Sequence, residues 1–251
     1  MQHETTLADT LALMRDLRRR CAWDAAQTHE SLRPYLVEEA LEVDEALRAG
    51  DDRLLREELG DLLLQILFHS VVAEERGAFT LLDVASGLVT KMRARHPHLY
   101  GTGDQEPWER MKAKRRTSVT DGLPVTLPAL HRAHRLQERA AGVGFDWPDA
   151  AGAFAKVAEE LEEVRAEVAA GSADPARVQD ELGDLLFACV NLCRKLGAHA
   201  AVALDRSTRT FVTRFRGVEA LARERGIVMQ DAPLDVLDGL WDEVKRSGAT
   251  V

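Results

Sequence analysis

Apolar residues recur at every third or fourth position along most of the chain, and this spacing predicts α-helices. In the first predicted helix, residues 5–20, the apolar positions are Leu7, Leu11, Met14 and Leu17. The same pattern predicts further helices at 34–49, 53–76, 80–95, 108–116, 130–141, 154–170, 175–196, 200–225 and 235–245. A loop is expected at 21–31, with Pro34 opening the second helix. Short connections between helices are typical of bundles, so the expected fold is all-α.

Glycines and prolines gather between residues 101 and 128 and interrupt the helical pattern. A chain of 251 residues suggests one or two domains. We therefore expect an N-terminal domain at 1–116, a linker at 117–128 and a C-terminal domain at 129–251. Each domain would be a four-helix unit.

The two halves carry the same pair of acidic motifs. Glu38-Glu39-x-x-Glu42 recurs 121 residues later in 159–163. The sequence Glu-Leu-Gly-Asp at 58–61 recurs 123 residues later at 181–184. The two extra residues fall in the connection between the helices, where an insertion costs little. The sequence thus predicts two related copies of one helical fold.

Composition narrows the function. The 33 basic and 42 acidic residues give a net charge of −9, which is unfavourable for nucleic-acid binding. No apolar run reaches the roughly 18 residues of a membrane span, and the N-terminus lacks an apolar signal core. Three cysteines are too few for a disulfide scaffold, so we expect a cytoplasmic protein.

The acidic motifs of the second half suggest a metal site. Residues three and four apart share a face of a helix, so Glu159, Glu160 and Glu163 are neighbours, as are Glu181 and Asp184 on the next helix. Two like charges a few ångströms apart repel by about 4 kcal/mol at an effective dielectric of 20. A compensating cation is therefore expected. Oxygen ligands favour Mg²⁺, with Mn²⁺ as a substitute, and Mg²⁺ points to phosphate chemistry.

A simpler interpretation has to be weighed against this one. Acidic runs are common on the solvated faces of helices, and one such motif alone carries little information. Both motifs recur in the same order in each half, which favours a shared function. A non-enzymatic helical interaction module stabilised by metal stays open as an alternative.

Several further motifs strengthen the interpretation. They are Cys-Ala-Trp-Asp-x-x-Gln-Thr at 21–28, His-Pro-His at 96–98, Leu-Pro-Ala-Leu at 127–130, Val-Gly-Phe-Asp-Trp at 143–147 and Glu-Leu-Gly-Asp-Leu-Leu-Phe at 181–187. With the acidic motifs, they resemble the all-α nucleoside triphosphate pyrophosphohydrolases, in the tandem arrangement of full-length MazG proteins. The resemblance covers nearly the whole chain. It implies Mg²⁺-dependent hydrolysis of NTPs and dNTPs to the monophosphate and pyrophosphate, with tolerance for most bases.

The resemblance also implies roles for individual residues, and it places catalysis in the C-terminal copy. The implied metal ligands are Glu160, Glu163, Glu181 and Asp184. Glu159 would ligate the metal or orient a ligand, so the expected catalytic glutamates are 159, 160 and 163. The implied reaction is attack of water on the α-phosphorus, with a carboxylate taking a proton.

Substrate contacts follow from the same resemblance. Lys156 would contact phosphates, and Asn191, Arg214 and Trp241 would line the nucleotide site. The family usually has a lysine where this chain has Thr210, so Arg209 or Arg206 is expected to substitute for it.

The first copy keeps its carboxylates but differs around them. A possible second metal site comprises Glu38, Glu39, Glu42, Glu58 and Asp61. Tyr35 stands where the second copy has Lys156, and Phe68 where it has Asn191. The first copy therefore lacks a cation for phosphate, and we expect weak or no catalysis there, with a structural or regulatory role.

Two further expectations concern assembly and specificity. A short helical hairpin has too little core to be stable alone, and the related enzymes resemble dimers, so a homodimer is expected. A narrower pyrophosphatase, acting on dUTP or phosphoribosyl-ATP, is the alternative enzyme.

Overall fold

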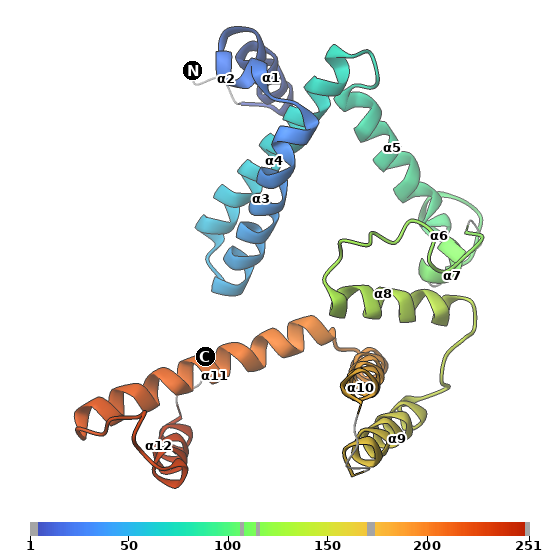
Figure 1. The fold of residues 1–251 in the computed structure, drawn as a ribbon. Coiled ribbons are helices and arrows are strands. Elements are labelled where there is room, and N and C mark those ends of the chain that lie inside the picture. Colours follow the sequence, from blue (N-terminus) through green and yellow to red (C-terminus); the bar gives the residue numbers. More distant parts are fainter. Residues whose placement is uncertain (1–4, 106–107, 114–115, 170–173, 249–251) are drawn as a thin grey trace. The chain divides into compact units, whose positions relative to one another are not determined.

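The computed structural model describes residues 5–105, 108–113, 116–169 and 174–248, and every regular element in these ranges is a helix (Figure 1). The all-α prediction is therefore confirmed. The chain divides into two compact units, Met1–Gln105 and Glu106–Val251. The boundaries expected from composition stay a prediction. The helix residues predicted at 114–115 and 170 lie outside the described residues.

The first unit is built around two long helices that lie side by side, α3 and α4 (Figure 1). Its described helices are α1 (Leu7–Arg20), α2 (Ala22–Ala26), α3 (His29–Ala49), α4 (Asp52–Glu75), α5 (Leu81–Ala94) and α6 (Pro97–Tyr100). A buried apolar cluster joins α1, α3 and α4. It contains Met14, Leu32, Leu67, Phe68, Val71 and Val72.

Helix α3 begins at His29, so the prediction that Pro34 opens this helix is wrong. The Thr28 hydroxyl accepts a hydrogen bond from the Ser31 N–H, and the Ser31 hydroxyl accepts one from the Thr28 N–H. This reciprocal cap starts the helix ahead of the proline. Pro34 then lies inside α3, where its ring removes one backbone hydrogen bond. The predicted loop at 21–31 also contains the short helix α2.

The second unit contains a second long hairpin, α9 with α10, and a separate pair, α11 with α12. Its described helices are α7 (Trp108–Ala113), α8 (Ala129–Gly142), α9 (Ala150–Ala169), α10 (Pro175–Lys195), α11 (Ala200–Glu224) and α12 (Leu234–Arg246). A buried cluster of Val218, Ala222, Leu240 and Val244 holds α11 against α12. Gln137 Nε2 on α8 donates a hydrogen bond of 2.8 Å to the Phe187 carbonyl on α10.

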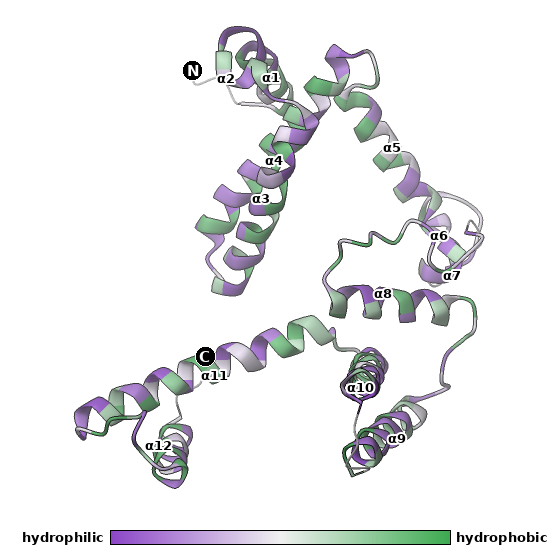
Figure 2. Cartoon of the chain, in the orientation of Figure 1, coloured by the Kyte–Doolittle hydropathy of each residue, from purple (hydrophilic) through white to green (hydrophobic). Residues whose placement is uncertain are grey.

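The helices carry hydrophobic and hydrophilic residues in alternation along their length (Figure 2). Several large apolar side chains of α9, α10 and α11 are exposed, including Phe154, Leu186 and Phe211 at 55%, 59% and 54%. Among the described helices, none is by itself long and apolar enough to cross a membrane, although α10 and α11 pass that test together as a pair bent by 101°.

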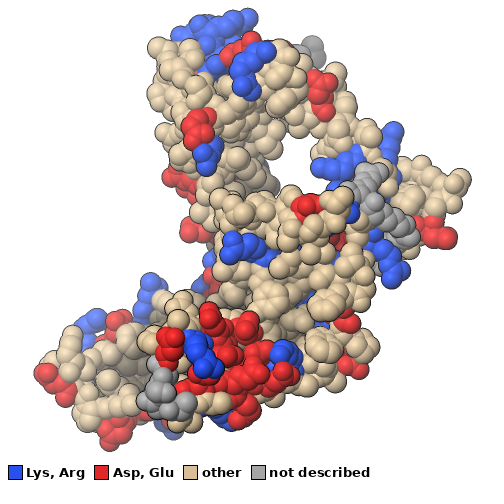
Figure 3. Space-filling view, turned by 45° about the vertical axis from the view of Figure 1, so that its right-hand side comes forward, with Lys and Arg blue, Asp and Glu red and all other residues tan. Residues whose placement is uncertain are grey.

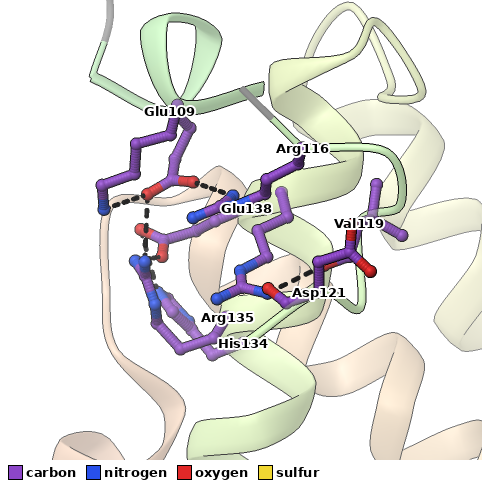
Figure 4. Close-up of polar contacts among 9 residues, drawn as sticks. Glu109, Arg116, Val119, Asp121, His134, Arg135 and Glu138 are labelled. Atoms are coloured by element: carbon purple, nitrogen blue, oxygen red, sulfur yellow. Dashed lines mark hydrogen bonds and ion pairs between the residues drawn. The ribbon is translucent and has the colours of Figure 1, made fainter. Parts of the chain in front are cut away.

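A half-buried ionic cluster fastens α7 to α8. The Glu109 carboxylate lies 3.0 Å from Lys112 Nζ, 3.2 Å from Arg116 Nη1 and 3.0 Å from Arg135 Nη2. Figure 4 shows these side chains converging on Glu109. Burial by itself would raise the pKa of Glu109, but the hydrogen bonds from Lys112, Arg135 and Arg116 outweigh it and lower the pKa from 4.5 to about 2. The segment before α8 is thus held on the second unit.

Candidate active site

Helices α9 and α10 bring acidic residues from two parts of the sequence together. Oxygens of Glu160, Glu163 and Glu181 lie within 4.8 Å of one another. Figure 3 shows acidic side chains gathered over this hairpin. Glu160 and Glu163 share a helix face because they are three residues apart, and Glu181 faces them from α10. Glu159 and Asp184 lie outside this group of three.

Lys156 lies one turn before these carboxylates on α9. Its Nζ is 2.8 Å from Glu159 Oε1 and 2.6 Å from Glu160 Oε1. Hydrogen bonds to Glu159 and Glu160 raise the pKa of Lys156, so its positive charge is retained. The Glu160 side chain is 6% exposed, and its Oε2 has no hydrogen-bond partner among the described residues. A buried carboxylate oxygen without a partner is unfavourable unless a cation or donor reaches it.

Glu163 is more exposed than Glu160 but is electrostatically tied to it. The pKa of Glu163 is raised, first by a hydrogen bond with Glu160, then by burial and by the Glu160 charge, against an opposing effect of Lys156. The raised pKa means that Glu163 holds a proton more readily than an isolated glutamate. The raised pKa reflects the closeness of the Glu160 carboxylate, which Lys156 offsets only in part.

A cavity of about 830 Å³ adjoins the acidic cluster. Its polar lining includes Lys156, Glu160, Asp184 and Asn191. The structure therefore brings four of the predicted site residues to one cavity. The remainder of the lining is largely apolar and includes Leu136, Ala140, Phe145, Trp147 and Phe187.

Sequence reasoning missed part of this cavity. Val119 and Thr120 line it, although both belong to the segment predicted as a linker. Arg139 Nη1 donates hydrogen bonds of 2.9 Å to the carbonyls of Val119 and Asp121 (Figure 4). The Asp121 carboxylate accepts a hydrogen bond from the Ser118 N–H. Backbone carbonyls held by an arginine leave no periodic signal in a sequence.

Arg214 and Trp241 line a different cavity, of about 600 Å³, between α11 and α12. Arg206 and Thr210 line it as well. Arg209 is not among its lining residues, and its Nε lies 3.2 Å from Asp205 Oδ2. Of the two arginines expected to replace the family lysine, Arg206 thus faces the cavity. Asp205 and Arg209 are four residues apart on one helix, so their ion pair could have been predicted from the sequence.

The equivalent hairpin of the first unit also gathers carboxylates. Oxygens of Glu39, Glu58 and Asp61 lie within 4.8 Å of one another, whereas Glu38 and Glu42 are outside this group. Burial, followed by the charges of Asp61 and Glu42, raises the pKa of Glu39.

In the first unit, aromatic rings occupy the positions that correspond to polar residues of the cavity lining in the second unit. The centroid of the Trp23 ring lies 6.4 Å from that of Tyr35 and 6.4 Å from that of Phe68, both in edge-on contact. Tyr35 and Phe68 are the counterparts of Lys156 and Asn191. The first unit therefore has the acidic cluster without the lysine beside it.

The chain is similar to known proteins over most of its length. The family model described as "MazG nucleotide pyrophosphohydrolase domain" matches it twice, at residues 27–100 and 152–219. The nucleoside triphosphate pyrophosphohydrolase/pyrophosphatase MazG of Thermotoga maritima is 43% identical over 92% of this chain and 91% of its own. A nucleoside triphosphate pyrophosphohydrolase of Escherichia coli K12 is 39% identical over 93% of each chain. An uncharacterized Bacillus subtilis protein, YabN, is 39% identical over 94% of this chain and 51% of its own.

The fold, the duplicated acidic hairpin and these relatives define the class of protein, a hydrolase acting on phosphoric anhydride bonds. The chain belongs to the MazG nucleotide pyrophosphohydrolase family. The resemblance drawn from the sequence motifs is thereby confirmed, as is the tandem arrangement.

Proposed function

We propose that the α9–α10 hairpin is the active site of a Mg²⁺-dependent enzyme that converts NTPs and dNTPs to monophosphates and pyrophosphate with broad base tolerance. One observation carries the proposal. The oxygens of Glu160, Glu163 and Glu181 gather within 4.8 Å beside a cavity that Lys156 also lines. The relatives named as nucleoside triphosphate pyrophosphohydrolases agree with it.

The donor set fits a hard divalent cation. All of the clustered ligand atoms are carboxylate oxygens, and Glu160 Oε2 is buried without a partner among the described residues. Glu160, Glu163 and Glu181 would hold the ion, with Asp184 approaching from the cavity and Glu159 orienting Lys156. When bound, Mg²⁺ supplies the positive charge that neutralises phosphate oxygens and activates water.

The side chains of the cavity have separate roles in binding the substrate and moving a proton. Lys156 binds phosphate oxygens and stabilises the charge that develops on the departing pyrophosphate. Glu163, whose pKa is raised, takes a proton from the water that attacks the α-phosphorus. The apolar cavity lining from Leu136 to Phe187 accepts the base through nonspecific contact, which suits broad base tolerance.

Arg214, Trp241 and the neighbouring Arg206 would contribute a second set of nucleotide contacts from the cavity between α11 and α12. Arg209, paired with Asp205, would act only if that pair opened. In the first unit, the carboxylates at 38, 39, 42, 58 and 61 would form a possible second metal site with weak or no catalysis and a structural or regulatory role.

We extend the proposal to a cytoplasmic homodimer. The exposed apolar side chains of α9, α10 and α11 favour a second copy as the covering partner. Light scattering on the full chain would then give twice the 27.8 kDa of one chain. A fully active monomer at micromolar concentration would contradict this part.

The reaction is tested by measuring pyrophosphate release from each NTP and dNTP separately, with Mg²⁺ and with an EDTA control. Activity on several bases supports the proposal. Activity on dUTP or phosphoribosyl-ATP alone would favour the narrower enzyme, and no activity would favour the interaction module. In ¹⁸O-labelled water, attack at the α-phosphorus places the label in the monophosphate.

A further inference from the structure

Asn191 is tied to the loop before α9 through one arginine. Its Oδ1 accepts two hydrogen bonds from Arg194, of 3.1 Å from Nε and 2.7 Å from Nη2. The same guanidinium donates to both carboxylate oxygens of Asp146, at 3.1 Å from Nη1 to Oδ2 and through Nη2 to Oδ1. Asn191, Arg194 and Asp146 all line the large cavity.

This arrangement fixes which end of the Asn191 amide is available to a ligand. An amide oxygen has two lone pairs, and both are used by Arg194. Turning the amide over would place its NH₂ group against the guanidinium, donor against donor. The Nδ2 group is therefore the end that can bind a ligand, and it can only donate.

The anchor for Arg194 is itself held firmly. Lys195 Nζ lies 3.3 Å from Asp146 Oδ2 and donates a hydrogen bond of 2.6 Å to the Trp147 carbonyl. The Trp147 ring lies against Gly152 at the start of α9, where an added Cβ would be 2.8 Å from the ring. The side chains of Arg194 and Asp146 are 13% and 21% exposed. The relay is thus a hydrogen-bonded part of the cavity wall.

The first unit serves as an internal comparison. Phe68 stands at the position of Asn191, and Val71 stands at the position of Arg194. Both are buried in the apolar core of that unit. The second unit thus has both Lys156 and the hydrogen-bonded Asn191–Arg194 pair. The first unit has neither, because Tyr35, Phe68 and Val71 stand at these positions.

We propose that Asp146 is a positioning residue that acts through Arg194 to present the Asn191 amide as a hydrogen-bond donor to an acceptor oxygen of the bound nucleoside triphosphate. The inference rests on the proposed function, because it takes the cavity to be the nucleotide site. Asp146 touches no substrate in this account. Its effect on binding passes entirely through Asn191.

A double-mutant cycle on the full chain tests the relay. Binding of an NTP analogue with a methylene group between the α- and β-phosphorus is measured by calorimetry with Mg²⁺. We expect Asn191→Leu and Asp146→Asn each to weaken binding by about tenfold, the range for one hydrogen bond to a charged group. The double variant should weaken it by about tenfold too, because both changes remove the same contact.

Two further variants complete the design. Arg194→Lys keeps an ion pair with Asp146 but loses the planar fork, so we expect it to behave like Asn191→Leu even if Asp146→Asn folds poorly. Asp149→Asn is the matched control, since Asp149 lies in the same loop and, within the part of the chain that the structure describes, accepts its hydrogen bond from the Ala151 N–H. Its binding should equal that of the unsubstituted chain.

The outcomes distinguish a failure of the Asp146–Arg194–Asn191 relay from a failure of the proposed enzymatic function. Additive effects of about a hundredfold in the double variant would show that Asp146 acts independently of Asn191 and would overturn the relay. A loss of thermal stability in Asp146→Asn with unchanged affinity would overturn it as well, leaving a purely structural role. If the unsubstituted chain releases no pyrophosphate and binds no analogue, the proposed function itself fails.

Discussion

Lys156 Nζ lies 2.6 Å from Oε1 of Glu160, while Oε2 of the same carboxylate is buried and accepts no hydrogen bond within the described ranges. Oε1 is thus paired with the Lys156 ammonium group, and Oε2 is available to a bound metal ion. An unsatisfied buried polar group costs about 1–3 kcal/mol. The protein therefore maintains a local instability that a bound cation would relieve.

Removing the charge of Glu163 tests the assigned chemistry. We expect Glu163→Gln to lower pyrophosphate release by about a hundredfold or more, because a proton acceptor and a metal ligand are both lost. Circular dichroism should show an unchanged helical fold. Glu162→Gln is the control, since Glu162 is exposed and pairs with Arg165 on the same helix. Near-normal turnover in Glu163→Gln would refute the assignment.

Removing carboxylates of the first unit should have little effect on turnover. A Glu38→Ala, Glu42→Ala double variant should keep its turnover within about twofold, since the first unit has Tyr35 where the second has Lys156 and so lacks a cation for phosphate. Pyrophosphate release is the measurement, with the melting temperature recorded alongside. Complete loss of activity in a folded double variant would show that the first unit takes part in catalysis.

The ionic cluster at Glu109 contributes to the stability of the second unit. A lowered carboxyl pKa stabilises the fold above the pKa of the unfolded state, and this contribution is lost as pH falls from about 4.5 through about 2. After discounting for solvent screening, Glu109→Gln should reduce the free energy of unfolding at pH 7 by about 2 kcal/mol. Urea denaturation measures it, and a loss below about 0.5 kcal/mol would contradict the account.

Two histidines, His134 and His199, make the second unit sensitive to acid. The His199 ring centroid at the start of α11 lies 4.2 Å from that of His134 and 4.6 Å from that of His131, both on α8. Burial lowers the pKa of His134 and His199, and the charge of Arg135 adds to the effect while that of Glu138 opposes it.

The sign of the pH effect follows directly. The unfolded chain binds protons at higher pH than the folded chain does, so stability is present above about pH 6.5 and is lost as pH falls. His134→Gln should flatten the decline in urea-unfolding free energy between pH 7.5 and pH 5.5. His98→Gln, at an exposed position, is the control and should leave the decline unchanged. Equal slopes in both variants would exclude the cluster as its cause.

Much of the acidic cluster was predictable because helical spacing is regular. Glu160 and Glu163 had to share a face, and the repeated motif on α10 supplied Glu181. The position of Asp184 was less certain, since one turn along α10 takes its carboxylate out of the group of three and into the cavity lining. Short-range periodicity cannot resolve such a difference.

Contacts between distant segments were not predictable. No sequence rule places Arg139 against the carbonyls of Val119 and Asp121, because backbone acceptors look alike in every residue. The start of α3 was misplaced for a local reason. Pro34 is a stronger signal in the sequence than the Thr28–Ser31 cap that begins the helix.

The hydrogen bonds from Arg139 to the carbonyls of Val119 and Asp121 determine where the chain can be truncated. A fragment that starts at Ala129 would retain every carboxylate of α9 and α10 yet be missing one side of the cavity. Such a fragment could bind cations normally while handling nucleotides poorly. An intact cavity therefore needs residues that precede Ala129 as well as the α9–α10 hairpin.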